Sequence, residues 1–175
     1  LGAWGLTEPG SGSDAAGART RAERRGDSWV INGSKTFITN PSLGSITTVL
    51  AVTTPEKKQK GITAFVVEKG TPGYRVGRHL EKLGMRASDT CELFFEECAV
   101  PLDHQLGALD AGFMDTLKIL DKGRISIASL ALGLGEGAYE AARAYAKERR
   151  QFGRPLADNQ AIQFMLADMR MNLDA

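Results

Sequence analysis

The first hundred or so residues alternate between short apolar runs and turn residues, a pattern typical of β-strands. Runs rich in β-branched and aromatic residues follow one another closely, and no helical period connects them. They lie at residues 29–31, 35–39, 45–53, 61–70, 71–77 and 91–101. Because closely spaced short strands pair with their neighbours, an antiparallel barrel or sandwich is predicted.

A tight turn is expected early in this region. The dipeptide Asn32-Gly33 separates the runs 29–31 and 35–39. Asn-Gly between two β-rich runs is a strong signal for a two-residue hairpin. We therefore predict that the chain reverses at these two residues.

The pattern changes near Leu106-Gly107. No proline occurs between Gly112 and Arg150, and the apolar positions fall at helical spacing. Small residues are frequent from 128 to 142, which favours the close approach of another helix.

A second helix is expected after the break at FGRPL. Asp158 or Asn159 can cap its start. Its apolar face would comprise Ile162, Met165, Leu166, Met169 and Leu173.

The sequence thus predicts an α+β, multi-domain chain. An antiparallel β-barrel or sandwich at 1–106 is followed at 107–175 by part of an up-and-down helical bundle. Since Leu1 is not an initiator methionine and the last helix lacks a terminal cap, a piece of a longer protein is expected.

Composition excludes several function classes. The chain has 175 residues, of which 42% are hydrophobic and 25% charged, and its net charge is +1. This balance is typical of a globular protein and offers no strong field for nucleic acid or a membrane surface. No apolar run approaches the ~20 residues of a membrane helix.

Cys91 and Cys98 form no C-x-x-C pair and have no histidine near them in sequence, so reduced structural thiols and no metal site are expected.

The segment GLTEPGSGSD at 5–14 suggests a ligand. Gly10, Gly12 and Ala15 satisfy the G-x-G-x-x-G/A spacing of a dinucleotide-binding loop. That fold needs a helix and a parallel strand after the loop, whereas a hairpin signal follows here. A plain turn would explain the glycines. The amides and hydroxyls of the loop would also suit an anionic ligand.

The longer segment at residues 5–17, GLTEPGSGSDAAG, resembles the signature of the acyl-CoA dehydrogenases, which are FAD-dependent flavoproteins. GSKTFITN, KLGMRASDT, ECAVPLDHQLG, LDKGRISIASLALG and ERRQFGRPLADNQAIQFMLADM also resemble family motifs, in the family's order. The resemblance implies the middle β-domain, which binds flavin and acyl-CoA, followed by the start of the C-terminal helical domain. The implied reaction is α,β-dehydrogenation of an acyl-CoA thioester to the trans-2-enoyl-CoA, with FAD as cofactor.

The resemblance implies a first flavin segment from Trp4 to Ser13. Leu6 and Thr7 would meet the isoalloxazine ring, where the Thr7 hydroxyl and nearby amides would bind its pyrimidine edge. Ser13 would reach the pyrophosphate and also lie near the acyl-CoA. Donors at that edge favour reduction, because reduced flavin gains negative charge there.

A second implied flavin segment is Phe37, Ile38 and Thr39. Phe37 would shield one flavin face, at a position where many members have tryptophan, and Thr39 would donate to flavin N5. From the residues alone, the favoured interpretation of this stretch is an alternating strand with Phe37 in a core.

The family is tetrameric or dimeric, and a neighbouring subunit completes each FAD site. The resemblance assigns this role to Arg149, Gln151, Phe152 and Gln160, with Arg149 on the pyrophosphate. Taken alone, Arg149 is a charge at a helix C-terminus.

The implied acyl-CoA stretch is Asp121, Lys122, Gly123 and Arg124. Arg124 would support the catalytic base, although Asp121 and Arg124 would also form an ordinary i,i+3 ion pair. In isovaleryl- and long-chain-type members the base is a glutamate at the position of Gly123. Glycine cannot act as a base, so no catalytic residue is expected within 1–175, and a downstream glutamate is expected instead.

The implied substrate is a short or short/branched-chain acyl-CoA, and the implied electron acceptor is an electron-transfer flavoprotein. A homotetramer or dimer is expected, without nucleic-acid or membrane partners, in a bacterial cytoplasm or a mitochondrial matrix. An acyl-CoA oxidase, a flavin monooxygenase-like enzyme and a non-catalytic flavin- or CoA-binding module remain open.

Overall fold

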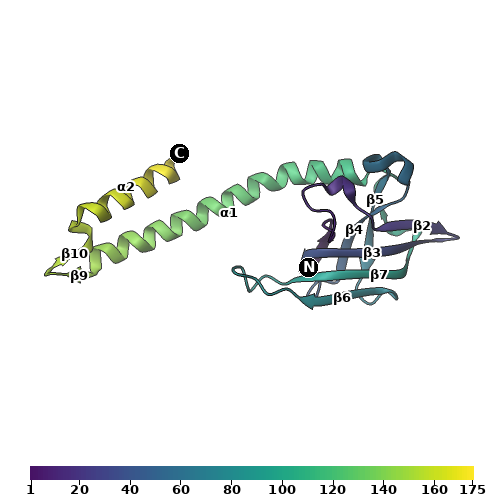
Figure 1. Ribbon diagram of the computed structural model, residues 1–175, viewed down its shortest axis with the longest axis horizontal. Helices are drawn as coiled ribbons and strands as arrows, with labels where there is room; N and C mark the ends of the chain where they lie inside the picture. The colour runs from purple at the N-terminus through teal and green to yellow at the C-terminus, as the bar shows by residue number, and fades with distance from the viewer. The chain divides into compact units, whose positions relative to one another are not determined.

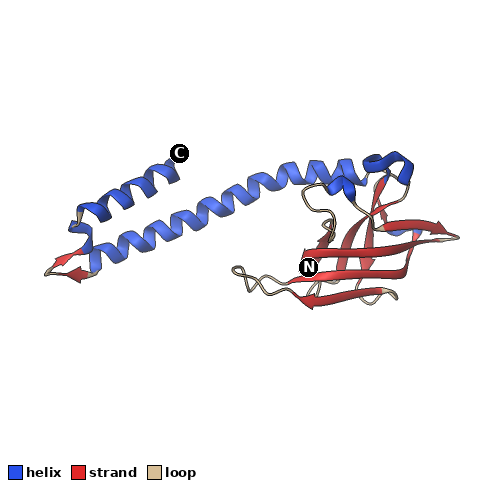
Figure 2. Cartoon of the chain, viewed as in Figure 1, coloured by secondary structure: helices blue, strands red, loops and turns tan.

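The computed structural model describes residues 1–175. Contacts divide the chain into two compact units, Leu1–Lys118 and Ile119–Ala175. The first contains the large sheet, and the second is helical apart from one small hairpin (Figure 2). The mixed α+β class that the sequence predicts is confirmed.

The first unit is built on an eight-stranded sheet with the order β6-β7-β3-β2-β4-β5-β8, and β1 pairs with β4. The strands are β1 Gly2–Gly5, β2 Arg21–Arg25, β3 Ser28–Thr39, β4 Ile46–Val52, β5 Ile62–Glu68, β6 Tyr74–His79, β7 Thr90–Pro101 and β8 Gln105–Leu106. Short 3-10 turns occur at Ala15–Gly17, Pro55–Gly61 and Leu102–His104.

Most pairings in this sheet are antiparallel, as the spacing of the runs predicts. Two are parallel: β1 pairs with β4 along its length, and β2 meets β4 through Arg21 and Val52. These two pairings depart from the prediction, because the chain leaves β1 and forms β2 and β3 before β4 returns beside β1.

The predicted hairpin at Asn32-Gly33 is wrong. Strand β3 continues through both residues, and the chain reverses earlier, at Gly26. Gly33 lies in a bulge opposite β7 with φ +146, where a Cβ would lie 2.6 Å from Thr20 Oγ1. The Asn32 side chain accepts from the Glu97 amide and donates to the Glu97 carboxylate. The dipeptide Asn32-Gly33 therefore forms part of a β-bulge rather than a turn.

The core lies where the sheet curls over itself. Strands β4 and β5 cross β3 and β7 at a steep angle (Figure 1). The Trp29 ring of β3 packs against the Phe65 ring of β5, with centroids 5.3 Å apart, although these strands are not neighbours in the sheet. Cys91 and Cys98 are buried free thiols, and burial raises the pKa of each to about 11. Their burial agrees with a structural role, and their redox state stays a prediction.

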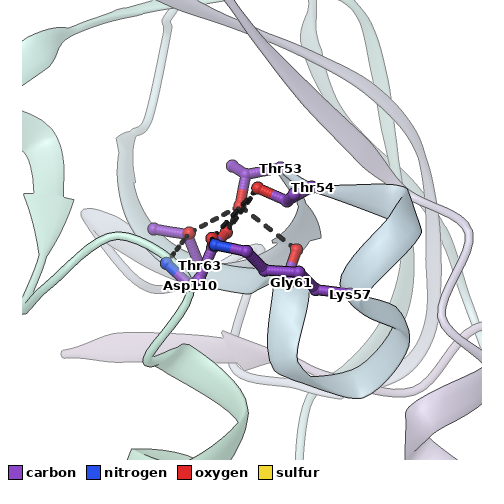
Figure 3. A network of polar contacts seen from close by, with 6 residues as sticks. All are labelled: Thr53, Thr54, Lys57, Gly61, Thr63 and Asp110. Carbon is purple, nitrogen blue, oxygen red and sulfur yellow. Dashed lines mark hydrogen bonds and ion pairs between the residues drawn. The ribbon is translucent and has the colours of Figure 1, made fainter.

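A polar network fixes the chain just before helix α1, Gly112–Glu148 (Figure 3). Asp110 accepts hydrogen bonds from the hydroxyls of Thr53 and Thr54 and pairs with Lys57 Nζ at 2.7 Å. Its amide donates to the Thr63 hydroxyl. Burial opposes the ionisation of Asp110, but these donors outweigh it and hold its pKa below the ordinary value.

In the second unit, α1 is followed by the hairpin β9 Arg150–Gln151 and β10 Arg154–Pro155, a 3-10 turn at Leu156–Asp158, and α2 Gln160–Asp174. Leu173 of α2 lies 3.0 Å from where a Cβ of Gly135 would stand, so this small residue does permit close packing. Asn159 precedes α2 as predicted, but its side chain binds Leu156 and Arg154 rather than capping the helix. Neither helix is long and apolar enough to cross a membrane.

Candidate functional site

The structure brings together two of the predicted flavin segments. The Thr36 amide donates a hydrogen bond of 2.9 Å to the Thr7 carbonyl. The Lys35 ammonium donates to the Leu6 carbonyl at 3.1 Å. The loop after β1 therefore lies against the second half of β3, which carries Phe37.

The loop leaves hydrogen-bond donors unused. The amide and the hydroxyl of half-buried Thr7 make no hydrogen bond within the chain. The hydroxyls of Ser13 and Thr39 are exposed and likewise have no partner in the chain. These groups can bind the acceptor atoms of a ligand.

Phe37 has a strained backbone and an exposed ring. Its φ is +57, and it lies at a bulge between Lys35 and Ile38 opposite β7. The side chain is 68% exposed, so the alternative that places Phe37 in a core is wrong. A left-handed conformation at a bulky residue costs ~1–3 kcal/mol and persists where the fold imposes it. Ile38 is buried in the core, which leaves only its main chain for a ligand.

The glycines of the signature loop are not required by the fold. A Cβ at Gly10 or Gly12 would meet no atom of the chain within 4 Å, and neither residue has a positive φ. The loop is instead closed by paired main-chain bonds between Glu8 and Ser11 and by the Ser11 hydroxyl on the Asp14 carbonyl. The open space beside both glycines suits the close approach of a ligand.

A buried ion pair lies beneath the loop, and sequence reasoning missed it. Lys35 Nζ is 2.8 Å from Glu8 Oε1, with side-chain exposures of 0% and 6%. Burial opposes the ionisation of Glu8, but Lys35 outweighs it and the Glu8 pKa lies below its ordinary value. Burial lowers the pKa of Lys35, against the attraction of Glu8. Local alternation does not signal this pair, because the bulge between Ile31 and Gly33 breaks the period of β3 before Lys35.

The structure also places a histidine beside a cysteine, which the sequence did not suggest. His79 at the end of β6 pairs with Asp89 at 2.9 Å, and Cys91 donates to the same carboxylate oxygen at 3.3 Å. These three side chains present potential metal ligands within 4.8 Å of one another. Their mutual hydrogen bonds already account for the cluster without a bound ligand.

The remaining predicted residues belong to the helical unit. Asp121 and Arg124 form the i,i+3 surface pair, with 3.5 Å between Oδ1 and Nε. Lys122 is exposed and Gly123 is half-buried. Phe152 stands fully exposed between β9 and β10. The other residues assigned to a neighbouring flavin are also exposed: Arg149, Gln151 and Gln160.

Comparison with known proteins decides the family. The family model "Acyl-CoA dehydrogenase, middle domain" matches residues 3–98, and "Acyl-CoA dehydrogenase, C-terminal domain" matches 110–175. The chain belongs to the acyl-CoA dehydrogenase family. The predicted family is therefore confirmed, and members of this family are FAD-dependent oxidoreductases.

Individual relatives span the whole chain. It is 47% identical over 175 residues to the short-chain specific acyl-CoA dehydrogenase of Clostridium acetobutylicum, covering 100% of this chain and 46% of the relative. It matches the structure of butyryl-CoA dehydrogenase from Megasphaera elsdenii with a TM-score of 0.96 and 46% identity, over 99% of this chain and 46% of that one. A chain in a structure of the electron transferring flavoprotein of Acidaminococcus fermentans matches with a TM-score of 0.97 and 46% identity, over the same shares. The chain thus spans less than half the length of these relatives.

Proposed function

We propose that the complete protein containing this chain is an acyl-CoA dehydrogenase for short or short branched acyl chains. It converts the thioester to the trans-2-enoyl-CoA and passes electrons to an electron-transfer flavoprotein. The observation that carries the proposal is the junction of the Thr7 loop with β3, where unused donors lie beside strained, exposed Phe37. The short-chain and butyryl-CoA specificities of the relatives support the chain-length class, and the structure with an electron transferring flavoprotein supports the acceptor.

The residues of this junction fit a flavin. Bound FAD supplies the hydride acceptor for the reaction. The Thr7 amide and hydroxyl would bind the pyrimidine edge and stabilise the negative charge that develops there on reduction. Phe37 would cover one flavin face and exclude water, and the Thr39 hydroxyl would donate to N5. Trp4 and Leu6 complete the lining, and Ser13 would bind the pyrophosphate and lie near the thioester.

The proton-abstracting base is proposed to lie outside residues 1–175. Glu8 is excluded because its carboxylate is buried and bound by Lys35 and by the amides of Arg19 and Thr20. Glu136 is paired with Arg170 at 2.8 Å. Gly123 cannot abstract a proton, so a glutamate elsewhere in the protein would take the α-proton.

The helical unit is proposed to serve the substrate and a second subunit. Asp121, Lys122, Gly123 and Arg124 would line the acyl-CoA, with Arg124 supporting the base. Arg149, Gln151, Phe152 and Gln160 would complete the FAD site of a neighbouring subunit in a homotetramer or dimer. Full exposure of Phe152 supports this role, since an apolar side chain at a hairpin tip is suited to burial by a partner.

Two further assignments follow the family resemblance. We assign residues 1–106 to the middle β-domain and 107–175 to the C-terminal helical domain. The location would be the cytoplasm in a bacterium or the mitochondrial matrix in a eukaryote.

The test is anaerobic reduction of the complete protein by acyl-CoA thioesters of increasing chain length. We expect butyryl-CoA to bleach the flavin absorbance and palmitoyl-CoA to do so far more slowly. Electrons should then pass rapidly to an electron-transfer flavoprotein and slowly to oxygen. Fast reoxidation by air would instead support an acyl-CoA oxidase, and absence of bleaching by any thioester would support a non-catalytic binding module.

A further inference from the structure

Lys35 binds the loop after β1 through two acceptors. Its ammonium donates to the Leu6 carbonyl at 3.1 Å and to Glu8 Oε1 at 2.8 Å, and its side chain is wholly buried. Replacing a buried ion pair by apolar side chains is often neutral or stabilising, because desolvation offsets the attraction between the charges. Stability alone therefore does not account for a lysine here, and its geometric effect on the loop is the feature to explain.

The Glu8 carboxylate also binds the main chain before β2. Its carboxylate accepts the Arg19 amide at 2.7 Å and the Thr20 amide at 3.0 Å in addition to Lys35. The carboxylate thus ties the loop to the segment that precedes β2 as well as to β3. With both of its oxygens engaged, Glu8 fixes where the Lys35 ammonium lies.

The contact with Lys35 fixes the orientation of one peptide group, the one between Leu6 and Thr7. The Leu6 carbonyl and the Thr7 amide belong to the same peptide unit, and in a planar trans peptide the C=O and N–H bonds point in opposite directions. Because Lys35 holds the carbonyl, the Thr7 N–H must point away from Lys35. That N–H has no hydrogen-bond partner in the chain. The Thr36 amide fixes the next carbonyl, that of Thr7, at 2.9 Å.

We propose that Lys35, held by Glu8, is a positioning residue that orients the Leu6–Thr7 peptide so that its N–H faces the flavin. This inference rests on the proposed flavin role of the loop. A reversed peptide would present a carbonyl oxygen to the acceptor edge of the flavin, and would weaken binding most when the flavin is reduced and carries more negative charge. Lys35 therefore contributes to FAD affinity and raises the flavin midpoint potential without touching the cofactor.

The test compares three variants of the complete protein: Lys35→Met, the double variant Lys35→Met/Glu8→Gln, and the control Val67→Ala. Val67 is fully buried in the hydrophobic core on β5 and its apolar side chain makes no hydrogen bond to the loop, so its truncation is expected to lower stability and to leave the Leu6–Thr7 peptide in place. We expect both Lys35 variants to bind FAD about tenfold more weakly or worse, as for loss of one hydrogen bond, and to shift the midpoint potential to more negative values. The control should keep wild-type affinity and potential despite a lower melting temperature. A folded double variant with wild-type affinity and potential overturns the proposal.

A second measurement needs no variant. Hydrogen exchange of the Thr7 amide in the wild-type protein should slow at least about tenfold when FAD binds, because the amide gains an acceptor. Bound FAD with an unprotected Thr7 amide also overturns the proposal. Failure of the wild-type protein to bind FAD at all would instead overturn the proposed function, so the two failures are distinguishable.

Discussion

The Thr36 amide donates a hydrogen bond of 2.9 Å to the Thr7 carbonyl and so joins two segments that lie far apart in the sequence. One segment is the glycine-rich loop after β1, and the other is the bulged half of β3 that carries Phe37. Several effects of substitution follow from this junction and from the sheet that supports it.

Phe37→Gly should separate stability from cofactor binding. The substitution removes a strained left-handed conformation at φ +57 and an exposed ring. The free energy of unfolding of the FAD-free protein should not fall, and should rise by up to about 1 kcal/mol. FAD affinity should fall, because the aromatic surface is lost. Thermal unfolding and FAD titration measure the two effects, with Phe37→Trp as the control that retains binding. A large loss of FAD-free stability would show that Phe37 packs within the fold.

Gly12→Ala should leave the FAD-free fold intact and impair binding. A Cβ at this position meets nothing in the chain within 4 Å, so unfolding should change by less than about 0.5 kcal/mol. A methyl group in the space assigned to the ligand should weaken FAD or acyl-CoA binding. Unchanged affinity for both ligands would show that this space is not part of the site.

Gly33→Ala tests the bulge in β3. The added Cβ would lie 2.6 Å from Thr20 Oγ1 at a φ of +146, so a loss of more than about 2 kcal/mol in the free energy of unfolding is expected. Gly26→Ala is the matched control, since it also has a positive φ but no neighbouring atom within 4 Å. It should cost about 1 kcal/mol. Equal losses in the two variants would contradict the close approach of Thr20.

Asp110 should contribute to the pH dependence of stability. Burial opposes its ionisation, but Lys57, Thr53 and Thr54 lower its pKa below the ordinary value. A lowered carboxyl pKa gives stability that is present above the ordinary pKa and is lost as pH falls through the folded value. Asp110→Asn should therefore destabilise the protein at pH 7, by about 1–3 kcal/mol, and flatten its acid-induced loss of stability. The exposed residue Asp103 offers the control Asp103→Asn, which should change neither. An unchanged acid profile in Asp110→Asn would contradict the role of the network.

The positions of several strands and of both helices along the chain were predictable because they depend on local periodicity, whereas β1, β2 and β8 lie outside the predicted runs. The alternating runs became β4, β5 and β7, and the proline-free apolar stretch became α1. The bulge at Asn32-Gly33 was not predictable, because the choice between turn and bulge is made by distant partners. Thr20 crowds the glycine, and Glu97 binds the asparagine side chain.

The site was predictable only in part for the same reason. The family motifs name its segments, but the exposure of Phe37 depends on a bulge that local alternation does not reveal. The pairing of Lys35 with Glu8 joins residues 27 positions apart, and no sequence period encodes it.

The most direct measurement is a crystal structure of the complete protein with FAD bound. The proposed flavin site predicts that the Thr7 amide lies about 3 Å from an acceptor atom at the pyrimidine edge of the flavin, with the Phe37 ring against one flavin face. A structure in which FAD is bound but contacts neither Thr7 nor Phe37 would contradict it.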